Sequence, residues 1–422
     1  MSFFIYISFI LIIAFSLSKS LKRDKRTFSV NKFLWIYVLI FWGVAPLFQY
    51  IFQQFPWNIQ ISKIAAFKAN SLILLFIFVY SFFYKKFAGN SSPGTKSGLP
   101  IIPFRIKPFG IVLVLLIQTG ILIFFYLNYG GIYFLRGEAT GADVIGGSQA
   151  IHLIISQVFR AFSTIITVVL VINYKFNKSL PAFTVLLVSL IILLLTNFPL
   201  SIARYMAGAF YLAIFFVYKP AFKRKNIVVL GLIFLLLIVY PAISVLRNLS
   251  NIENFAYAGA SVESFLSGDF DNYSTLSMTI QYVKEQGITF GRQLLGVLLF
   301  YVPRSIWPQK PVGSGAFVAD SQNMVFTNIS SPIVAEGYIN FGLFGIFLFA
   351  LIIAFITARF DTRFYRIGKL NFLKLYYPIF LGLIFFILRG DLMSSFAYSV
   401  SFAVAAIIFI KLVNPFINYK EI

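Results

Sequence analysis

The sequence contains no cysteine and a single histidine, His152. Without cysteine the chain has no disulfide bond, no thiolate metal site and no cysteine nucleophile. One histidine leaves little material for a histidine-based metal centre, and we interpret His152 as a satisfied polar group, not as a catalytic one. We therefore predict no metal and no other cofactor.

Charged residues are also scarce, because they make up 11% of the 422 residues, against about 25% in soluble domains. Hydrophobic residues reach 59%, and the mean hydropathy is +0.88. These values predict an all-α membrane protein that crosses the bilayer several times. The net charge of +22 does not indicate a nucleic-acid partner, because the basic residues occur in short clusters between apolar runs.

Apolar runs long enough to cross a hydrocarbon core of about 30 Å recur along the whole chain. They predict eleven transmembrane helices in one integral membrane domain, residues 1–422, at about 2–18, 33–52, 70–84, 109–128, 151–172, 180–197, 202–218, 227–246, 338–358, 372–388 and 393–411. The loops on one side hold about 24 of the 35 basic residues, but only Asp24, Asp361 and Glu421 among the acids. That side is therefore predicted to be cytoplasmic, with the N-terminus outside and the C-terminus inside.

Two loops on the outer side are long. Residues 128–150 form the shorter one, and residues 247–337 form a large loop that we expect to carry the functional site. Within the large loop, residues 264–286 look helical in places, and the apolar run 293–301 is too short to span the bilayer, which predicts a re-entrant or interfacial helix. The stretch richest in polar residues is 301–345. Its polar groups are costly beside lipid unless they face water or substrate.

Several arginines on this outer side lie in apolar surroundings: Arg160, Arg204, Arg247, Arg304 and Arg389. Each of them alone could reach out to the membrane surface or pair with a nearby acid. Together they predict a cationic basin, because a guanidinium offers a rigid two-pronged fork for phosphate oxygens. Such a basin suits a pyrophosphate that is carried at the membrane surface.

Acidic residues on the same side are candidates for a general base. Glu336 is the first candidate, since it opens a predicted helix directly after a polar turn, and Asp320 and Asp391 are the others. Glu336 could equally well cap that helix and interact with its dipole. Asp269 and Asp271 are two carboxylates two residues apart, which is a weak signal for a divalent cation, and we predict no metal there.

Five motifs on the outer side resemble the Wzy-type polymerases of O-antigen and capsule polysaccharides: FPLSIARYMAG, GDFDNYS, YVPRSIWPQKP, NISSPIVAEGYINFGLFG and LRGDL. The resemblance covers about residues 190–400. It implies a membrane glycosyltransferase, similar to the C-type enzymes, that acts on undecaprenyl-pyrophosphate-linked oligosaccharides at the extracytoplasmic face of the bacterial inner membrane. The growing chain would pass from its lipid carrier to the next lipid-linked repeat unit and yield the O-antigen of lipopolysaccharide, a capsule or an exopolysaccharide. A chain-length regulator and a flippase are the implied protein partners.

Combined with the charge pattern, the resemblance implies roles for individual residues. The pyrophosphate would be bound by Arg204, Arg304 and Arg389, with Arg247 and Lys310 in reserve. The proton of the attacking hydroxyl would be taken by Glu336 or, failing that, by Asp320 or Asp391. Sugars would be oriented by Asn328, Ser330, Asn340 and Trp307, although asparagine and serine in turns are often local caps.

Three other functions stay open at this point. A flippase or exporter of the same lipid-linked sugars should show paired interrupted helices and charges near the bilayer midplane, whereas here the polar groups concentrate in the loops of one face. An O-antigen ligase, which uses a lipid A core acceptor, has a similar architecture and differs only in the motifs. A purely structural membrane partner would leave the arginine basin unexplained.

Overall fold

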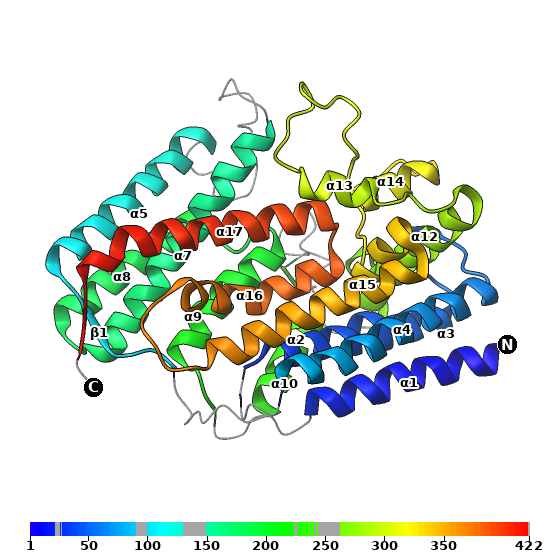
Figure 1. Ribbon diagram of the computed structural model, residues 1–422, viewed down its shortest axis with the longest axis horizontal. Coiled ribbons are helices and arrows are strands. Elements are labelled where there is room, and N and C mark those ends of the chain that lie inside the picture. The colour runs from blue at the N-terminus through cyan, green and yellow to red at the C-terminus, as the bar shows by residue number, and fades with distance from the viewer. Residues whose placement is uncertain are drawn as a thin grey trace.

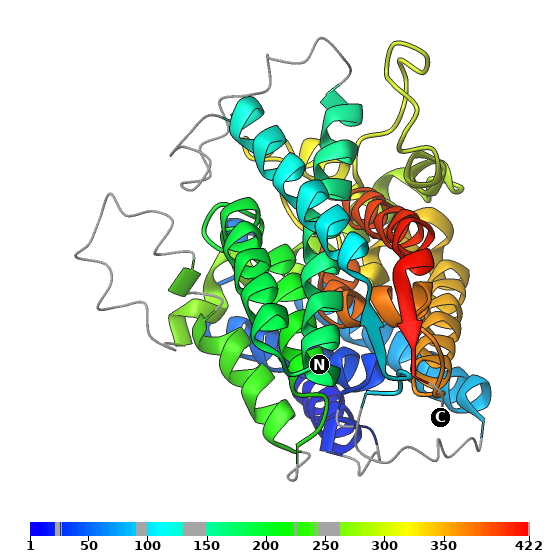
Figure 2. The same ribbon diagram turned by 90° about the vertical axis from the view of Figure 1, so that its left-hand side faces the viewer.

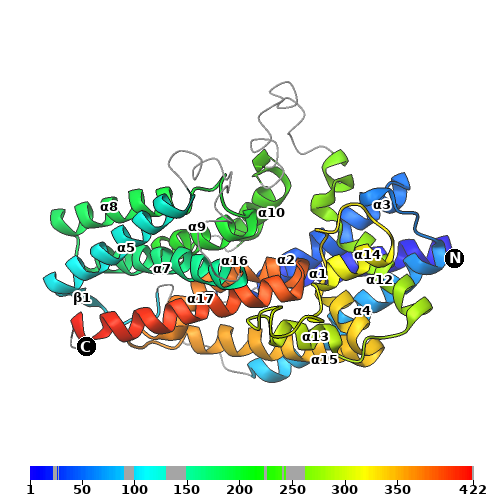
Figure 3. The same ribbon diagram turned by 90° about the horizontal axis from the view of Figure 1, so that it is seen from above.

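The computed structural model describes residues 1–21, 26, 28–89, 99–129, 149–222, 226–239, 242–243 and 262–420. Nearly all of the secondary structure in these residues is helical, and the two chain termini lie at opposite ends of the long axis (Figure 1, Figure 3). The described residues contain one small antiparallel sheet, in which β1 (Phe104–Ile106) pairs with β2 (Ile417–Tyr419) beside the C-terminus (Figure 2). The predicted helical fold class is thus confirmed.

Within the described residues, eight helical segments are long and apolar enough to cross a membrane. They are α1 (Ser2–Leu21), the continuous run α2–η1–α3, α4 (Lys63–Ala88), α5 (Pro108–Tyr129), α7 (Gln149–Phe176), α15 (Ile333–Phe364), α16 (Phe372–Arg389) and α17 (Leu392–Val413). Three shorter apolar helices are α8 (Leu180–Thr196), α9 (Arg204–Tyr218) and α10 (Asn226–Phe234), which η4 (Leu235–Val239) continues. Each of the eleven predicted spans overlaps one of these segments, while the number of crossings and the side that each end faces stay predictions.

The second span is one continuous helix made of three parts. Helix α2 (Val30–Tyr37) is followed by a wider π-helical turn, η1 (Val38–Val44), and then by α3 (Ala45–Phe52). Pro46 explains the wider turn, because proline has no N–H to donate and its ring crowds the carbonyl one turn earlier. The helix continues through the proline with a local change of pitch.

Helix α15 is the longest element in the described part of the chain, and its 32 residues extend about 48 Å. It packs along α4 and against α16, and α16 in turn packs against α17 (Figure 1). The backbone leaves the helical region at Phe341 and Gly342. Just before this bend, the buried side chain of Asn340 accepts a hydrogen bond from the Leu294 N–H at 3.0 Å, which ties the bend to α13 (Arg292–Leu298).

One end of the bundle is organised around Asp361, which is fully buried near the C-terminus of α15. Its carboxylate accepts hydrogen bonds from the N–H groups of Val30 (2.8 Å) and Asn31 (3.1 Å) and from the hydroxyls of Tyr84 (2.9 Å) and Tyr377 (2.7 Å). These four donors come from α2, α4 and α16. A single side chain therefore joins four helices at the end that we predict to be cytoplasmic.

At the other end lie three short helices of the predicted large loop: α12 (Asn272–Gln286), α13 and α14 (Ser314–Ser321) (Figure 1). The helical residues expected within 264–286 and the short helix expected within 293–301 are present as α12 and α13. Helix α15 begins at Ile333, so Glu336 lies in its first turn. The loop 130–148 and the first part of the large loop, residues 247–261, lie outside the described residues.

Candidate functional site

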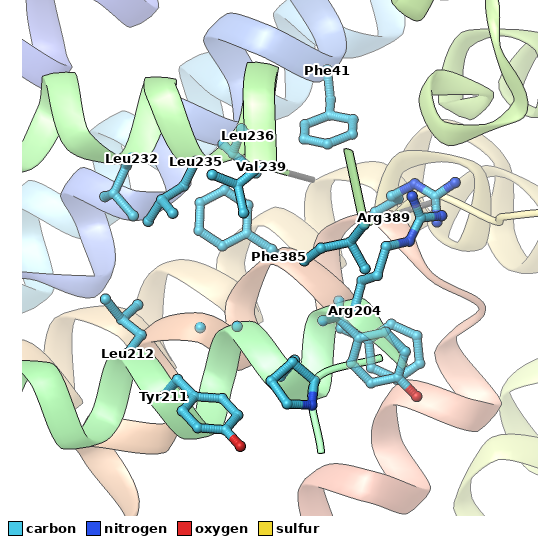
Figure 4. A pocket seen from close by; sticks show the side chains of 17 residues that line it. Phe41, Arg204, Tyr211, Leu212, Leu232, Leu235, Leu236, Val239, Phe385 and Arg389 are labelled. Carbon is cyan, nitrogen blue, oxygen red and sulfur yellow. The ribbon is translucent and has the colours of Figure 1, made fainter. Parts of the chain in front are cut away.

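An apolar groove lies between α9, α10 with η4, and α16, and its volume is about 340 Å³. Most of its wall is apolar, from Phe41, Leu212, Leu232, Leu235, Leu236, Val239, Phe385 and Phe386. Arg204 and Arg389 lie together at one end, while Leu212, Leu232 and Leu235 lie at the other (Figure 4). The groove therefore has a cationic end and an apolar end, as an amphiphilic anion requires.

Arg204 is the first residue of α9, and both prongs of its guanidinium contact Asp269. The Nη1–Oδ2 distance is 2.7 Å and the Nη2–Oδ1 distance is 2.5 Å. A cation at the N-terminus of a helix meets the positive end of the helix dipole, which is unfavourable. The two-pronged contact with Asp269 compensates for that cost and fixes the direction of the guanidinium.

Arg389 is the last residue of α16, where a cation interacts favourably with the helix dipole. Its side chain donates to the carbonyl oxygens of Gly268 (3.0 Å) and Asp269 (3.1 Å) and to Oδ1 of Asp271 (3.1 Å). The side chain of Asp271 is 1% exposed. We call Arg204, Arg389, Asp269 and Asp271 the arginine–aspartate cluster.

Two residues after Arg389, the turn between α16 and α17 presents a second ionisable group, Asp391. The turn is tight, because a Cβ on Gly390 would lie 2.4 Å from the ring of Phe386. Asp391 caps α17, since its Oδ1 accepts from the N–H groups of Met393 (2.9 Å) and Ser394 (3.3 Å). The turn thus links the groove, through Arg389, to the start of α17.

Glu336 completes a pair of carboxyl groups with Asp391, and the two interact electrostatically. Its side chain is fully buried, Oε2 accepts from the Ser314 hydroxyl at 2.7 Å, and Oε1 accepts from the Leu392 N–H at 3.1 Å. Its carboxylate therefore meets the first turn of α17, and no side chain caps the N-terminus of its own helix α15. Both carboxylates lie at the positive end of the α17 dipole.

Asp391 also reaches α14, because its Oδ2 accepts from the Gly315 N–H at 3.1 Å. Gly313 leaves the space for this contact, since a Cβ there would lie 2.2 Å from the same oxygen. Burial raises the pKa of Asp391, and the backbone N–H donors Gly315, Met393 and Ser394 oppose that shift. A carboxylate whose pKa is raised is a stronger base than an ordinary aspartate.

The structure places Arg304 and Lys310 away from the groove lining. Arg304 is exposed and donates to the carbonyl oxygens of Lys310 (2.8 Å) and Pro311 (3.4 Å). The Lys310 ammonium donates to the carbonyl oxygens of Phe300 (2.5 Å) and Val302 (3.0 Å). Burial, with a smaller effect of the Arg304 charge, lowers the pKa of Lys310. Both cations therefore stabilise the loop that contains them.

Other predicted residues divide into exposed and buried ones. Asp320 and Asn328 are exposed, and Trp307 is half-buried. Ser330 is buried, and its N–H donates to Oδ2 of Asp271 at 3.1 Å. Asn340 donates to the Glu336 carbonyl oxygen at 2.9 Å. The two buried residues thus support the arginine–aspartate cluster and the carboxyl pair, respectively.

Two further predicted residues differ in what the structure shows of them. Arg160 lies elsewhere, because it donates to the Thr196 carbonyl oxygen at 2.6 Å and its guanidinium lies 4.4 Å from the centre of the Phe125 ring. Arg247 lies outside the described residues, and the side chain of His152 does too.

The sequence analysis missed the roles of Asp269, Asp271 and Trp57. The pairing of the two aspartates with arginines could have been predicted, because acids among apolar residues require cationic partners and the same side of the chain contains lone arginines. Trp57 carried no such signal. Its indole N–H donates to Oδ2 of Asp271 at 3.2 Å across 214 residues of sequence, a contact that depends on how the helices pack.

Comparison with known proteins finds a match to one protein family. Residues 217–420 match the model of the family O-antigen polysaccharide polymerase Wzy. The resemblance that the motifs indicated is thereby confirmed, over a region that includes Asp269, Asp271, Glu336, Arg389 and Asp391. No curated protein and no solved structure gives a significant match to the chain.

Proposed function

We propose, from the Wzy family match of residues 217–420, that this multi-pass membrane protein polymerises lipid-linked oligosaccharide repeat units into a surface polysaccharide. The donor is the growing chain on undecaprenyl pyrophosphate, and the acceptor is the next lipid-linked repeat unit. The reaction takes place at the extracytoplasmic face of the bacterial inner membrane. A chain-length regulator and a flippase are its expected partners.

The observation that supports this proposal is the apolar groove with Arg204 and Arg389 at one end. A polyprenyl tail is apolar throughout, and its pyrophosphate carries charged oxygens that match the two prongs of a guanidinium. The groove offers both kinds of surface in the order in which this lipid presents them. Arg247 stays a further candidate for the pyrophosphate.

The chemistry follows from the same geometry. The bond between the sugar anomeric carbon and the pyrophosphate oxygen breaks, and a bond from that carbon to the acceptor hydroxyl oxygen forms. The electron pair of the broken bond leaves with the lipid pyrophosphate, whose charge Arg204 and Arg389 stabilise. The proton of the acceptor hydroxyl passes to a carboxylate.

Glu336 and Asp391 are the candidates for that carboxylate. Asp391 is half-buried and therefore more accessible to a hydroxyl than Glu336, which is fully buried and accepts from Ser314 and Leu392. Each oxygen of Asp391 has two lone pairs, so its backbone contacts leave acceptor capacity. Asp320 lies on the exposed side of α14 and is the reserve candidate.

The two segments that flank α14, residues 299–313 and 322–332, are the proposed surface for the oligosaccharide. Arg304 is exposed and Trp307 half-buried in the first, and Asn328 is exposed in the second. These side chains provide hydrogen-bond donors and an aromatic face, which are the groups that bind sugars. Lys310 holds the backbone of the first segment in place.

The test is complementation of cells that lack the chain with wild type, with Arg389→Ala or with the control Arg363→Ala. Arg363 is an exposed arginine in the last turn of α15. At equal amounts in the membrane, Arg389→Ala should accumulate single repeat units on undecaprenyl pyrophosphate, whereas Arg363→Ala should make polymer of normal length. A normal ladder from Arg389→Ala would remove the groove from the mechanism. In cells without the chain, repeats held on the cytoplasmic side would indicate a flippase, and accumulated lipid-linked polymer would indicate a ligase.

A further inference from the structure

Asp269 and Asp271 are two residues apart and each pairs with an arginine of the groove, but their surroundings differ. The side chain of Asp271 is 1% exposed, whereas that of Asp269 is 18% exposed. Asp269 lies in a single short turn, Gly268–Phe270, whereas Asp271 is the residue directly before the longer α12. The two carboxylates are chemically alike, so their different burial indicates that they have different roles.

Asp271 is held from three directions. Its carboxylate accepts from Arg389 of α16 at 3.1 Å, from the Trp57 indole at 3.2 Å and from the Ser330 N–H at 3.1 Å. Its own carbonyl oxygen accepts from the Thr275 N–H at 2.9 Å in the first turn of α12. Moving this buried carboxylate would break three hydrogen bonds at once, including the one from the buried Ser330 N–H, so Asp271 is a fixed part of the cluster.

Asp269 occupies the fork of Arg204 in the way a phosphate would. Both of its carboxylate oxygens accept from Arg204, which is 19% exposed and lines the groove. A partly exposed ion pair is stabilised only weakly, because water screens it and competes for its hydrogen bonds. A phosphate that approached Arg204 would meet a negative charge already in place, and the two anions repel each other.

The backbone of this turn is anchored independently of the Asp269 side chain. The carbonyl oxygens of Gly268 and Asp269 accept from Arg389, and the Trp57 ring lies against Gly268. Rotation of the Asp269 side chain away from Arg204 therefore leaves the contacts of Arg389 intact. Asp269 can therefore release Arg204 without disturbing Arg389.

We propose that Asp269 is an exchangeable counter-ion that the lipid pyrophosphate displaces from Arg204, whereas Asp271 is a fixed counter-ion that positions Arg389. The inference rests on the proposed function, because it assigns that site's anion to the groove. In the empty state Asp269 neutralises Arg204 beside the apolar groove. When the lipid pyrophosphate leaves after transfer, Asp269 returns to Arg204 and so assists release of the product.

The experiment measures binding of farnesyl diphosphate and of inorganic pyrophosphate to the full chain in lipid nanodiscs. The variants are Asp269→Asn, Asp271→Asn and the control Glu285→Gln, which removes the same charge from an exposed position at the end of α12. Asp269→Asn should bind farnesyl diphosphate about threefold to tenfold tighter than wild type, because a competing partly exposed ion pair is gone. Asp271→Asn should bind it about tenfold or more weakly, because the ion pair between Arg389 and the buried Asp271 carboxylate is broken, and Glu285→Gln should be unchanged.

Turnover gives a second readout that a merely structural role would not produce. With lipid-linked repeat units as substrate, Asp269→Asn should lower KM and kcat together, because both substrate and product lipid pyrophosphate are held more tightly. Weaker binding by Asp269→Asn would show that Asp269 organises the site and would overturn the inference, while the groove itself would stand. If wild type binds no farnesyl diphosphate, the proposed lipid site and the inference both fail. If Asp271→Asn does not fold, the inference is still decided by whether Asp269→Asn binds farnesyl diphosphate more tightly or more weakly than Glu285→Gln does.

Discussion

A leucine at Gly208 should block the apolar groove without touching its arginines. Gly208 lies on α9 and lines the groove, and a Cβ built on it meets no atom within 4 Å. The four carbon atoms of a leucine side chain would then take the place of about four carbon groups of a bound tail. At about 0.8 kcal/mol for each group, the loss is about 3 kcal/mol, or roughly a 150-fold weaker affinity for a polyprenyl diphosphate.

The assay for Gly208→Leu compares farnesyl diphosphate with inorganic pyrophosphate in nanodiscs. Only the first ligand has a tail, so its affinity should fall while that of inorganic pyrophosphate stays the same. Gly120→Leu is the matched control, because a Cβ at Gly120 also meets no atom within 4 Å and this residue of α5 does not line the groove. Both variants gain helix propensity equally. If Gly208→Leu binds farnesyl diphosphate and polymerises repeats like Gly120→Leu, the groove does not hold the lipid tail.

Three further changes test other parts of the site and fold. Glu336→Gln should lower kcat about 10²-fold to 10⁴-fold with KM unchanged if Glu336 accepts the proton, and an unchanged kcat would leave that role to Asp391. Gly313→Ala should destabilise the chain by about 1–3 kcal/mol, because the new Cβ would lie 2.2 Å from Oδ2 of Asp391, whereas Gly231→Ala in α10 meets open space, gains helix propensity and should not lower the melting temperature. Asp361→Asn should lower the melting temperature clearly, because all four donors lose a charged acceptor and two of them lose their acceptor oxygen, yet leave the affinity for farnesyl diphosphate unchanged.

The positions of the helices were predictable because hydropathy depends on sequence alone. Each apolar run of about twenty residues corresponds to a helix, including the three shorter ones, and the polar run after residue 301 lies with α13 and α14 at one end of the bundle. That Arg204 and Arg389 lie close to each other could likewise be predicted, since both were expected at the same end of the bundle. A lone arginine among apolar residues requires an anion, and that requirement can be read without a structure.

The groove itself could not be predicted. Leu212, Leu232 and Leu235 line it, but in sequence they are indistinguishable from leucines that face lipid. Arg304 shows the opposite difficulty, because its motif suggested the pyrophosphate whereas its guanidinium donates to carbonyl oxygens six and seven residues further along the chain. Trp57 contacts Asp271 only through the packing of distant helices.

The most direct test of the central claim is polymerisation by the purified chain alone. The chain is placed in vesicles with lipid-linked single repeat units on its extracytoplasmic side, and the products are separated on a gel. The account predicts a ladder of longer lipid-linked chains and the release of one lipid pyrophosphate for each bond formed. Repeat units that cross the vesicle membrane and remain single would contradict it.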